Sequence, residues 1–355
     1  TDIGDRFAYV LEQAHKQTGR QAVVLIDEYD KPILDVLDSG YRTQQNGEEI
    51  LLEEQHRNIL KGFYSVFKGA DPHLQFVLLT GVTKFSQVSV FSGFNQPEDI
   101  SMTRDYEALC GITKEELLSV FAEPIRRLAE DLDYSVAQTI GALRAHYDGY
   151  HFSKRMTGVF NPFSILNCFK QTSIEDYWFK SGTPTYLVRL LSHTQEQLND
   201  MVGQYYFPEE FIDYKATVEQ PLPMIYQSGY LTIKDYNRNL NTFLLDFPNN
   251  EVKKGFLTLV AADYLKPKER VTSWIQQAVG ALQQGKLEQF RDQLTAFLAS
   301  VPYSMRRKQD EREYERYFHY TFYLLLRLLS VYTVYSEKEQ SQGRADCIVE
   351  TPDYI

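Results

Sequence analysis

The sequence predicts an α/β protein whose N-terminal part contains a parallel sheet. The prediction rests on two short, continuous apolar runs, Ala22–Ile26 and residues 74–80, of which the first is rich in β-branched residues. Such runs are typical of strands that are buried on both faces. Between them, residues 50–67 repeat apolar side chains at the spacing of a helix. A strand, a long helix and a second strand form the βαβ unit of a doubly wound domain.

The composition is that of an ordered protein with more than one domain. The 355 residues are 43% hydrophobic and 14% aromatic, which is enough for large cores. The formal net charge of −11 excludes a general electrostatic attraction to nucleic acid or to anionic membranes, although a local basic groove is still allowed. No run of eighteen apolar residues is present, so we expect no transmembrane helix and no membrane partner.

The cysteines and the two ends indicate the setting of the chain. Cys110, Cys168 and Cys347 lie far apart and form no C-x-x-C pair, so we expect buried, reduced thiols and a cytoplasmic protein. The polar, acidic start has none of the features of a signal peptide. Because the chain begins without a methionine and its last residues resemble the start of a strand, we interpret it as a fragment of a longer protein.

After the predicted sheet, the pattern is mainly helical over residues 112–200. Thr113 and Glu116 have the spacing of a capping box and open a helix, which Pro124 is expected to kink or break. Farther along, apolar runs on either side of the polar residues 235–241 predict a hairpin. The remaining elements are expected to be helices over residues 270–300 and 309–330 and a strand pair over residues 331–355.

Two carboxylates, Asp27 and Glu28, directly follow the first predicted strand. The carboxyl end of such a strand faces the ligand crevice, where one acid can hold Mg²⁺ and the next can polarise a water for attack on a γ-phosphate. This is the Walker B pattern, although a solvated strand terminus explains the same two residues equally well. Thr80, which follows the second strand, either senses a γ-phosphate or forms a simple turn with Gly81.

No G-x-x-x-x-G-K-[ST] motif occurs in the sequence. That loop supplies the backbone amides and the lysine that surround the phosphates of a bound nucleotide. We therefore expect the chain as given to bind ATP weakly or not at all.

A conspicuous aromatic motif, Tyr147-Asp148-Gly149-Tyr150-His151, resembles a metal or catalytic cluster at first sight. Its Asp-Gly pair is a turn signal, and the histidine spacing around it is poor for a metal site on a helix. Buried aromatic residues far outnumber functional ones, so we expect this motif to cover the edge of a core.

Several segments together resemble the bacterial AAA-ATPase-like family whose members carry a C-terminal PD-(D/E)XK nuclease-like domain. The segments are residues 25–33, 79–86, 91–95, 147–152, 160–164, 229–233, 247–252, 343–346 and 351–354. The resemblance implies an incomplete P-loop-ATPase-like parallel sheet in residues 1–110 and a helical lid region in residues 111–204. It also implies a winged-helix-like and helical linker region in residues 205–300, and the start of a restriction-endonuclease-like α/β domain in residues 301–355.

The same resemblance assigns roles near the first sheet. Asp27 corresponds to the acid that holds Mg²⁺ and Glu28 to the acid that activates water, whereas Thr80 or Thr83 corresponds to the sensor residue. Thr83 and Lys84 are further expected cofactor contacts. ATP and Mg²⁺ are thereby implied for the parent protein, with neither expected to bind this chain tightly, because the family keeps its phosphate-binding loop upstream of this segment.

PD-(D/E)XK nuclease chemistry needs carboxylates around Mg²⁺ and a nearby lysine. By resemblance, Glu315 is the helix carboxylate and Asp346, in the run Gly-Arg-Ala-Asp, is the strand carboxylate. A solvated acid within a charged run explains Glu315 equally well. The E-x-K strand is expected after Ile355, so we predict no metal-dependent DNA cleavage by this chain.

Two functions are consistent with the sequence. The favoured one is a parent enzyme in which an ATPase-like part gates a metal-dependent nuclease acting on DNA or RNA, with this chain itself inactive. The alternative is a degenerate ATPase-like scaffold that binds a nucleic acid or a protein, which the missing loop and the negative charge support. A purely structural interpretation, with the acids as solvated strand ends, is disfavoured by the resemblance. The oligomeric state is left open.

Overall fold

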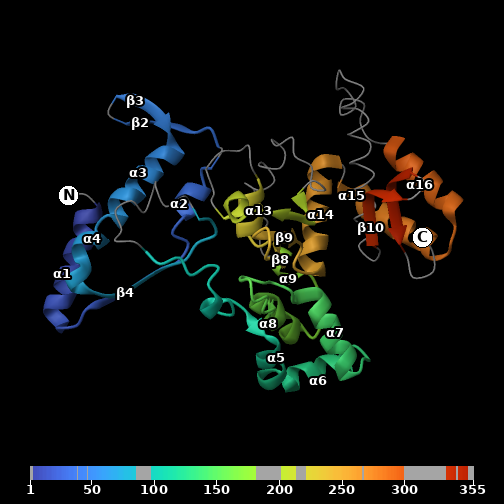
Figure 1. Ribbon diagram of the computed structural model, residues 1–355, viewed down its shortest axis with the longest axis horizontal. Helices are drawn as coiled ribbons and strands as arrows, with labels where there is room; N and C mark the ends of the chain where they lie inside the picture. Colours follow the sequence, from blue (N-terminus) through green and yellow to red (C-terminus); the bar gives the residue numbers. More distant parts are fainter. Residues whose placement is uncertain are drawn as a thin grey trace.

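The computed structural model describes residues 3–37, 39–45, 47–84, 97–180, 201–212, 221–265, 268–299, 333–340 and 343–350. Figure 1 shows the first helices and strands at one end, a central group of helices and small sheets, and the last helix with the final strand pair at the other end. Within these residues no helix has both the length and the apolar character needed to cross a bilayer.

The N-terminal elements form the βαβ unit that the sequence predicts. Helix α1 (Ile3–Thr18) leads into β1 (Ala22–Ile26), which pairs in parallel with β4 (Leu74–Leu79). Helix α3 (Leu52–Tyr64) separates the two strands in the chain and packs against α1. The shorter helices of this part are α2 (Lys31–Leu34), α4 (Phe67–Ala70) and the 3₁₀ turn η1 (Asp71–His73).

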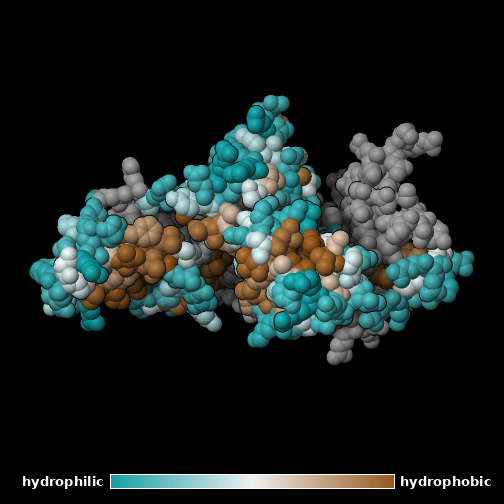
Figure 2. Space-filling model, turned by 90° about the horizontal axis from the view of Figure 1, so that it is seen from below, coloured by the Kyte–Doolittle hydropathy of each residue, from teal (hydrophilic) through white to brown (hydrophobic). Residues whose placement is uncertain are grey.

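The two parallel strands are covered on one face only, so the prediction of strands buried on both faces is wrong. Val23, Leu25 and Phe76 are 57%, 67% and 52% exposed, whereas Val24 and Val77 pack against the core. The reason is that β1 and β4 form a two-stranded sheet among the described residues, and α1 with α3 lies against one side of it. Figure 2 shows hydrophobic residues gathered on the surface of this end of the molecule. The described residues do not establish a wider P-loop-type sheet.

A hairpin that the sequence pattern did not predict precedes α3. It consists of β2 (Arg42–Gln45) and β3 (Glu48–Leu51), which pair antiparallel. The two strands are polar, so they lack the alternating apolar pattern of a buried strand. The available signal was the Asn46-Gly47 dipeptide, which is the preferred sequence of a two-residue hairpin connection.

The mainly helical region is confirmed over the described residues that follow. Thr113 forms the predicted capping box with Glu116, and the helix breaks at Phe121, three residues before Pro124. Cys168 is fully buried in this region, as expected, and burial raises the pKa of its thiol to about 12. Cys110 is exposed, so the expectation that it is buried is wrong. The elements are η2 (Arg104–Tyr106), β5 (Ile112–Thr113), α5 (Lys114–Val120), α6 (Ala122–Asp131), α7 (Val136–Tyr147), β6 (Val159–Phe160), α8 (Pro162–Gln171) and α9 (Tyr177–Lys180).

The next part contains a three-stranded antiparallel sheet in the order β7-β9-β8. The predicted hairpin is confirmed, although its first strand starts later and its turn is shorter than expected, because the strand continues through residues 235–237. The elements are β7 (Gln204–Tyr206), α12 (Pro208–Phe211), α13 (Leu222–Gln227), β8 (Thr232–Asn237), β9 (Thr242–Asp246) and α14 (Asn250–Leu265). A winged-helix-like arrangement and the domain boundaries stay predictions.

The helical structure predicted for residues 270–300 is confirmed and consists of α15 (Lys268–Gln283) and α16 (Leu287–Ala299). They are separated at Gly285, whose φ of 66° lies in the left-handed region that ends helices. The predicted strand pair is confirmed as β10 (Thr333–Gln340) and β11 (Gly343–Glu350), which are antiparallel. The helix expected over residues 309–330 lies outside the described residues.

We predict that Gly149→Ala lowers the free energy of unfolding by about 2 kcal/mol or more. Gly149 has a φ of 99°, and a Cβ there would collide with the Pro248 carbonyl oxygen and come within 2.8 Å of Lys234 Nζ. The matched control is Gly141→Ala in the middle of α7, where a Cβ meets nothing within 4 Å and should stabilise the helix by about 0.5–1 kcal/mol. Urea unfolding of both variants checks the pair, and equal effects would contradict the prediction.

Candidate functional site

The carboxyl ends of β1 and β4 bring three predicted site residues together. Ile26 lies opposite Leu79, and the Thr80 N–H donates to the Ile26 carbonyl oxygen at 2.8 Å, which extends the parallel ladder by one residue. The Thr80 hydroxyl then donates to Asp27 Oδ1 at 2.6 Å, and the Glu28 N–H donates to the same oxygen at 2.9 Å. All three side chains belong to exposed residues, so the cluster is open to a ligand.

Glu28 has an unusual backbone. Its φ of 51° lies in the left-handed region, which a glutamate rarely adopts and which is found most often at turns and functional sites. This conformation lets the chain turn sharply after Asp27, since the Tyr29 N–H donates back to the Thr80 carbonyl oxygen at 3.0 Å. The turn therefore presents two adjacent carboxylates at one edge of the sheet.

The donor set at this edge suits Mg²⁺ in the way that nucleotide sites hold it. Among the described residues no group of three or more His, Cys, Asp or Glu side chains is placed to surround a metal ion. Mg²⁺ in phosphoryl-transfer sites is held by one or two carboxylates together with substrate phosphates and waters, so a complete protein cage is not required. Asp27 fits that arrangement, because one carboxylate oxygen is engaged by Thr80 and the other makes no hydrogen bond to any residue that the structure describes.

Thr83 is part of the support beneath this edge. It is 2% exposed, and Asp30 Oδ2 accepts hydrogen bonds from its N–H at 2.5 Å and its hydroxyl at 2.8 Å. The carbonyl oxygen of Thr83 accepts from the Tyr29 hydroxyl, and a Cβ on Gly81 would come within 2.6 Å of Asp30 Oδ1. Asp30, which is fully buried and lies two residues after Glu28, is thus a key residue that sequence reasoning missed. Its signal was only its place four residues after the end of β1.

Lys84 is also engaged in the fold. Its Nζ forms an ion pair with Asp99 Oδ2 at 2.7 Å, and its backbone N–H donates to Gln227 Oε1 at 2.7 Å. Burial raises the pKa of Asp99, but hydrogen bonds from Lys84 and Ser101 and the Lys84 charge outweigh it and hold that pKa below its usual value. A nucleotide phosphate would have to compete with Asp99 for this ammonium group.

A sequence that resembles a phosphate-binding loop does occur, at residues 280–286. Two glycines and a lysine have the loop spacing there, but Leu287 stands in place of the hydroxyl residue. The segment is the end of α15, where the Lys286 N–H donates to the Ala281 carbonyl oxygen at 2.9 Å. A phosphate-binding loop has to follow a strand and open a helix, so this segment cannot serve as one.

In the C-terminal part, Asp346 lies on a strand, as the sequence predicts. It belongs to β11, whose pairing with β10 places Ser336 opposite Cys347 and Lys338 opposite Ala345. Glu315, the expected helix carboxylate, lies outside the described residues. The description of a nuclease-like site is therefore limited to the strand that carries one of its two predicted acids.

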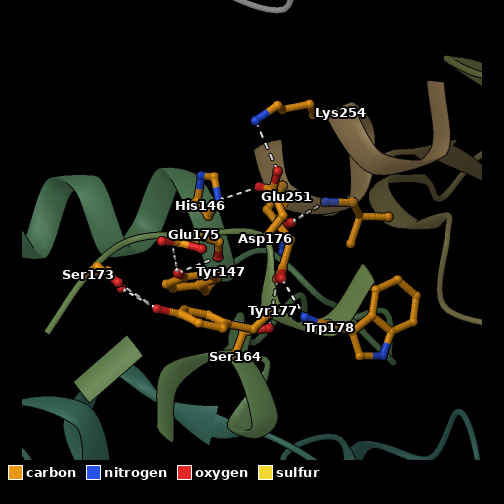
Figure 3. A network of polar contacts seen from close by, with 12 residues as sticks. His146, Tyr147, Ser164, Ser173, Glu175, Asp176, Tyr177, Trp178, Glu251 and Lys254 are labelled. Carbon is orange, nitrogen blue, oxygen red and sulfur yellow. Dashed lines mark hydrogen bonds and ion pairs between the residues drawn. The ribbon is translucent and has the colours of Figure 1, made fainter. Parts of the chain in front are cut away.

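A buried polar network joins the central helices (Figure 3). Glu251, which is completely buried near the start of α14, accepts hydrogen bonds from the Ser164 hydroxyl and the Trp178 N–H, both at 2.7 Å. Burial raises the pKa of Glu251 above its usual value, because these two donors only partly replace the lost hydration. The carboxylate ties α14 to α8 and α9, so its function is to hold the helices together.

The same network continues through Asp176 (Figure 3). Asp176 accepts from His146 Nε2 at 2.9 Å and pairs with Lys254 Nζ at 2.9 Å. These two partners outweigh burial and hold the pKa of Asp176 below its usual value. Next to them, the buried Tyr147 hydroxyl donates to the Glu175 carbonyl oxygen at 2.8 Å. Tyr147 belongs to the aromatic motif and His146 directly precedes it. The contacts of both residues agree with the structural role expected for the motif.

A cavity of about 510 Å³ opens beside this motif, at the start of α14. Arg144 and Lys253 line it together with Asp148 and Asp246, so positive and negative groups are mixed. The neighbouring Asn249 is 8% exposed, and its Nδ2 has no hydrogen-bond partner in the described part of the chain. The mixed charge gives this cavity no preference for a ligand of one sign.

We predict that wild-type stability relative to Glu251→Gln falls as the pH rises above 4.5, the usual pKa of a glutamate. The folded state holds the Glu251 proton more tightly than the unfolded chain does, so raising the pH favours the unfolded chain. Glutamine keeps an acceptor oxygen for Trp178 but does not ionise. Urea unfolding of both proteins from about pH 4 to about pH 8 measures the difference. A difference that stays constant with pH would contradict the raised pKa.

Comparison with known proteins finds two family matches and a relative. Residues 1–91 match the family described as predicted AAA-ATPase, and residues 313–355 match the PD-(D/E)XK nuclease superfamily. A protein of Azotobacter chroococcum mcd 1, described as an uncharacterized protein in the vnfD 5' region, is 34% identical over 347 residues. These residues are 97% of this chain and 63% of that relative, so the chain spans less than two thirds of the relative's length. No solved structure matches. The two matches, one near each end of the chain, are the combination of families that its motifs predict.

Proposed function

We propose that this chain is part of an enzyme in which an ATP-dependent switch controls a metal-dependent nuclease. The observation that supports it best is the hydrogen bond of 2.6 Å from Thr80 to Asp27, which joins the ends of two parallel strands. A polar residue at the end of the neighbouring strand, bonded to the first acid of a Walker B pair, is the arrangement that lets a γ-phosphate be sensed at the same place where Mg²⁺ is held. The cytoplasm is the proposed location.

Each residue of the proposed nucleotide site has a distinct task. Asp27 holds Mg²⁺ through its unbonded carboxylate oxygen, and Mg²⁺ in such sites neutralises charge that develops on the phosphates. Glu28 orients the attacking water and accepts a proton from it. Thr80 holds Asp27 by its hydroxyl and exchanges this partner for a phosphate oxygen. The lysine and backbone amides of a phosphate-binding loop would come from the parent protein, so ATP binding by this chain alone is expected to be weak.

The proposed nuclease site uses Asp346 and Glu315 as metal-holding carboxylates for hydrolysis of a DNA or RNA phosphodiester. Asp346 is on a strand of an antiparallel pair, which is a rigid position for a ligand. The coexistence of the two family segments in one chain supports coupling between them. Through that coupling, the nucleotide state would control access to the nucleic acid.

A binding scaffold is the second candidate function. It is favoured by the exposed apolar face of β1 and β4, where Val23, Leu25 and Phe76 are each more than half exposed. An apolar surface of this kind is typical of a contact with another polypeptide. A scaffold of this type would require neither of the two metal sites.

In the whole protein, we predict that Glu28→Gln lowers ATP turnover by about 100-fold or more while ATP binding is kept. The substitution removes the base but leaves the metal-holding Asp27 in place. Steady-state phosphate release at saturating Mg²⁺-ATP, with nucleotide binding by titration calorimetry, measures the two effects separately. Glu48→Gln, at an exposed position in β3, is the control that should change neither. Unchanged turnover in Glu28→Gln would exclude the proposed role.

We further predict that Asp346→Asn abolishes Mg²⁺-dependent cleavage of nucleic acid by the whole protein, because it removes a carboxylate that a divalent ion requires. Cleavage is measured on plasmid DNA and on single-stranded DNA and RNA, with and without ATP. Asp292→Asn, on an exposed part of α16, serves as the control. Cleavage by the Asp346→Asn variant would contradict the nuclease proposal and would leave the ATPase proposal unaffected.

A further inference from the structure

A second cavity, of about 390 Å³, lies between four segments that are far apart in the sequence. Its apolar lining comes from Met102, Pro208, Ile212 and Phe243. Three cationic side chains complete the wall, and these are Arg104, Lys154 and Arg155. This volume is within the usual range of small-molecule sites, and a mostly apolar wall with a few charged groups is their usual composition.

The positive charges at this cavity are only weakly neutralised by the protein. Arg104 forms no hydrogen bond or ion pair with any residue that the structure describes. The Lys154 ammonium group is held by neutral partners, the Tyr236 hydroxyl and Asn241 Oδ1, each at 3.0 Å. It also lies 4.5 Å from the centre of the Tyr236 ring. These contacts fix the position of the ammonium group without cancelling its charge.

Among the residues that the structure describes, the carboxylate paired with these cations is that of Glu107. Arg155 Nε lies 3.6 Å from Glu107 Oε1, which is a loose ion pair. Glu107 is 5% exposed and accepts hydrogen bonds from the hydroxyls of Ser153 and Thr157. Burial raises the pKa of Glu107, but these hydroxyls and the charges of Arg155 and Arg104 outweigh it and hold the pKa below its usual value. The carboxylate is therefore ionised, and within the described part of the chain three cations against this one anion leave two net positive charges at the cavity.

We propose that this cavity binds a phosphate monoester, carried either by a free nucleotide or by the phosphorylated end of a nucleic acid strand. A phosphate monoester has a charge of about −1.5 to −2 near neutral pH, which matches the net charge of the cavity. A phosphodiester inside a strand has a single charge and matches it less well. The two guanidinium groups suit the oxygens of a terminal phosphate, and the apolar wall accommodates the sugar or base attached to it.

Phosphate binding in this cavity does not depend on ATP binding at the end of β1. The cavity belongs to the central part of the molecule and uses none of the residues proposed for ATP or for the nuclease. It also shows how a chain with a net charge of −11 can bind a phosphate locally, because its cations are gathered around one cavity.

The test compares two forms of one fluorescent hexanucleotide, with a 5′-phosphate and with a 5′-hydroxyl. Binding to the chain is measured by fluorescence anisotropy in EDTA, which excludes metal-dependent binding elsewhere. We expect the phosphorylated form to bind about tenfold more tightly, and we expect Arg104→Ala to remove this preference, since one charge-assisted hydrogen bond is worth about that factor. Arg155→Gln should reduce the preference as well. Competition by AMP then distinguishes the two sources of the phosphate.

The control variant is Arg126→Ala, because Arg126 is an exposed arginine of α6 paired with Glu123 and distant in sequence from the cavity residues. It should leave binding of both oligonucleotides unchanged. Arg104→Ala is expected to fold normally, since Arg104 makes no bond in the described fold, and urea unfolding verifies this. Equal binding of the two oligonucleotides, no binding of either, or a preference that survives both Arg104→Ala and Arg155→Gln would overturn the proposal. AMP that competes fully identifies a free nucleotide as ligand, and AMP that competes poorly identifies a strand end; both outcomes support a monoester site.

Discussion

The parallel pairing of β1 with β4 is the constraint on which the proposed nucleotide site depends. Because both strands end at the same edge, the residue after β4 is placed beside the residue after β1. The Thr80 hydroxyl can then reach Asp27, and the backbone of Tyr29 can return to Thr80. The buried Asp30 carboxylate stabilises this edge from below by holding Thr83, so the two strand ends are linked twice. The ligand that we propose at Asp27 would therefore act on two loops that are joined by hydrogen bonds.

The middle of the chain depends on a different interaction, the burial of one carboxylate among three helices. Glu251 satisfies donors from α8 and α9, and the Asp176 group beside it adds His146 and Lys254. Breaking such a network by removing one partner leaves buried polar groups without hydrogen bonds, which is costly. Three of the segments that carry the family resemblance, residues 147–152, 160–164 and 247–252, contribute to this region. The residues of these three segments thus serve mainly to stabilise the fold. The proposed functional sites lie in other parts of the chain.

The sequence predicted those features that depend on local patterns. The strand at Ala22–Ile26, the capping box at Thr113, the β8–β9 hairpin and the final strand pair all rest on composition and spacing over a few residues. Its failures involve long-range packing. The number of covered faces on β1 depends on how many elements lie against it, and no local pattern contains that information. The hydrogen bond from Thr83 to Asp30 is likewise absent from any local pattern, since it depends on the approach of two loops 53 residues apart.

The candidate sites show most clearly the difference between features that depend on local patterns and features that depend on long-range packing. Asp27, Glu28 and Thr80 could be found because strand ends are visible in the sequence, and the structure brings them together. The cations of the central cavity could not be found in this way. Lys154 and Arg155 are adjacent in the chain, but Arg104 lies about 50 residues before them, and only the folded chain gathers the three. Their net charge is also visible only once Glu107 is placed opposite them.

A single glutamine provides a physical link between the two proposed ligand sites. The segment that follows β4 is attached to Gln227 through the Lys84 N–H, at 2.7 Å. The other end of the same amide group donates to the Ile212 carbonyl oxygen at 2.5 Å, and Ile212 lines the central cavity. Movement of the loop after Thr80 must either carry Gln227 with it or break this bond. Coupling between two sites requires an element whose position both ligands affect. Gln227 meets the geometric part of that requirement, because it contacts the loop of one site and the wall of the other.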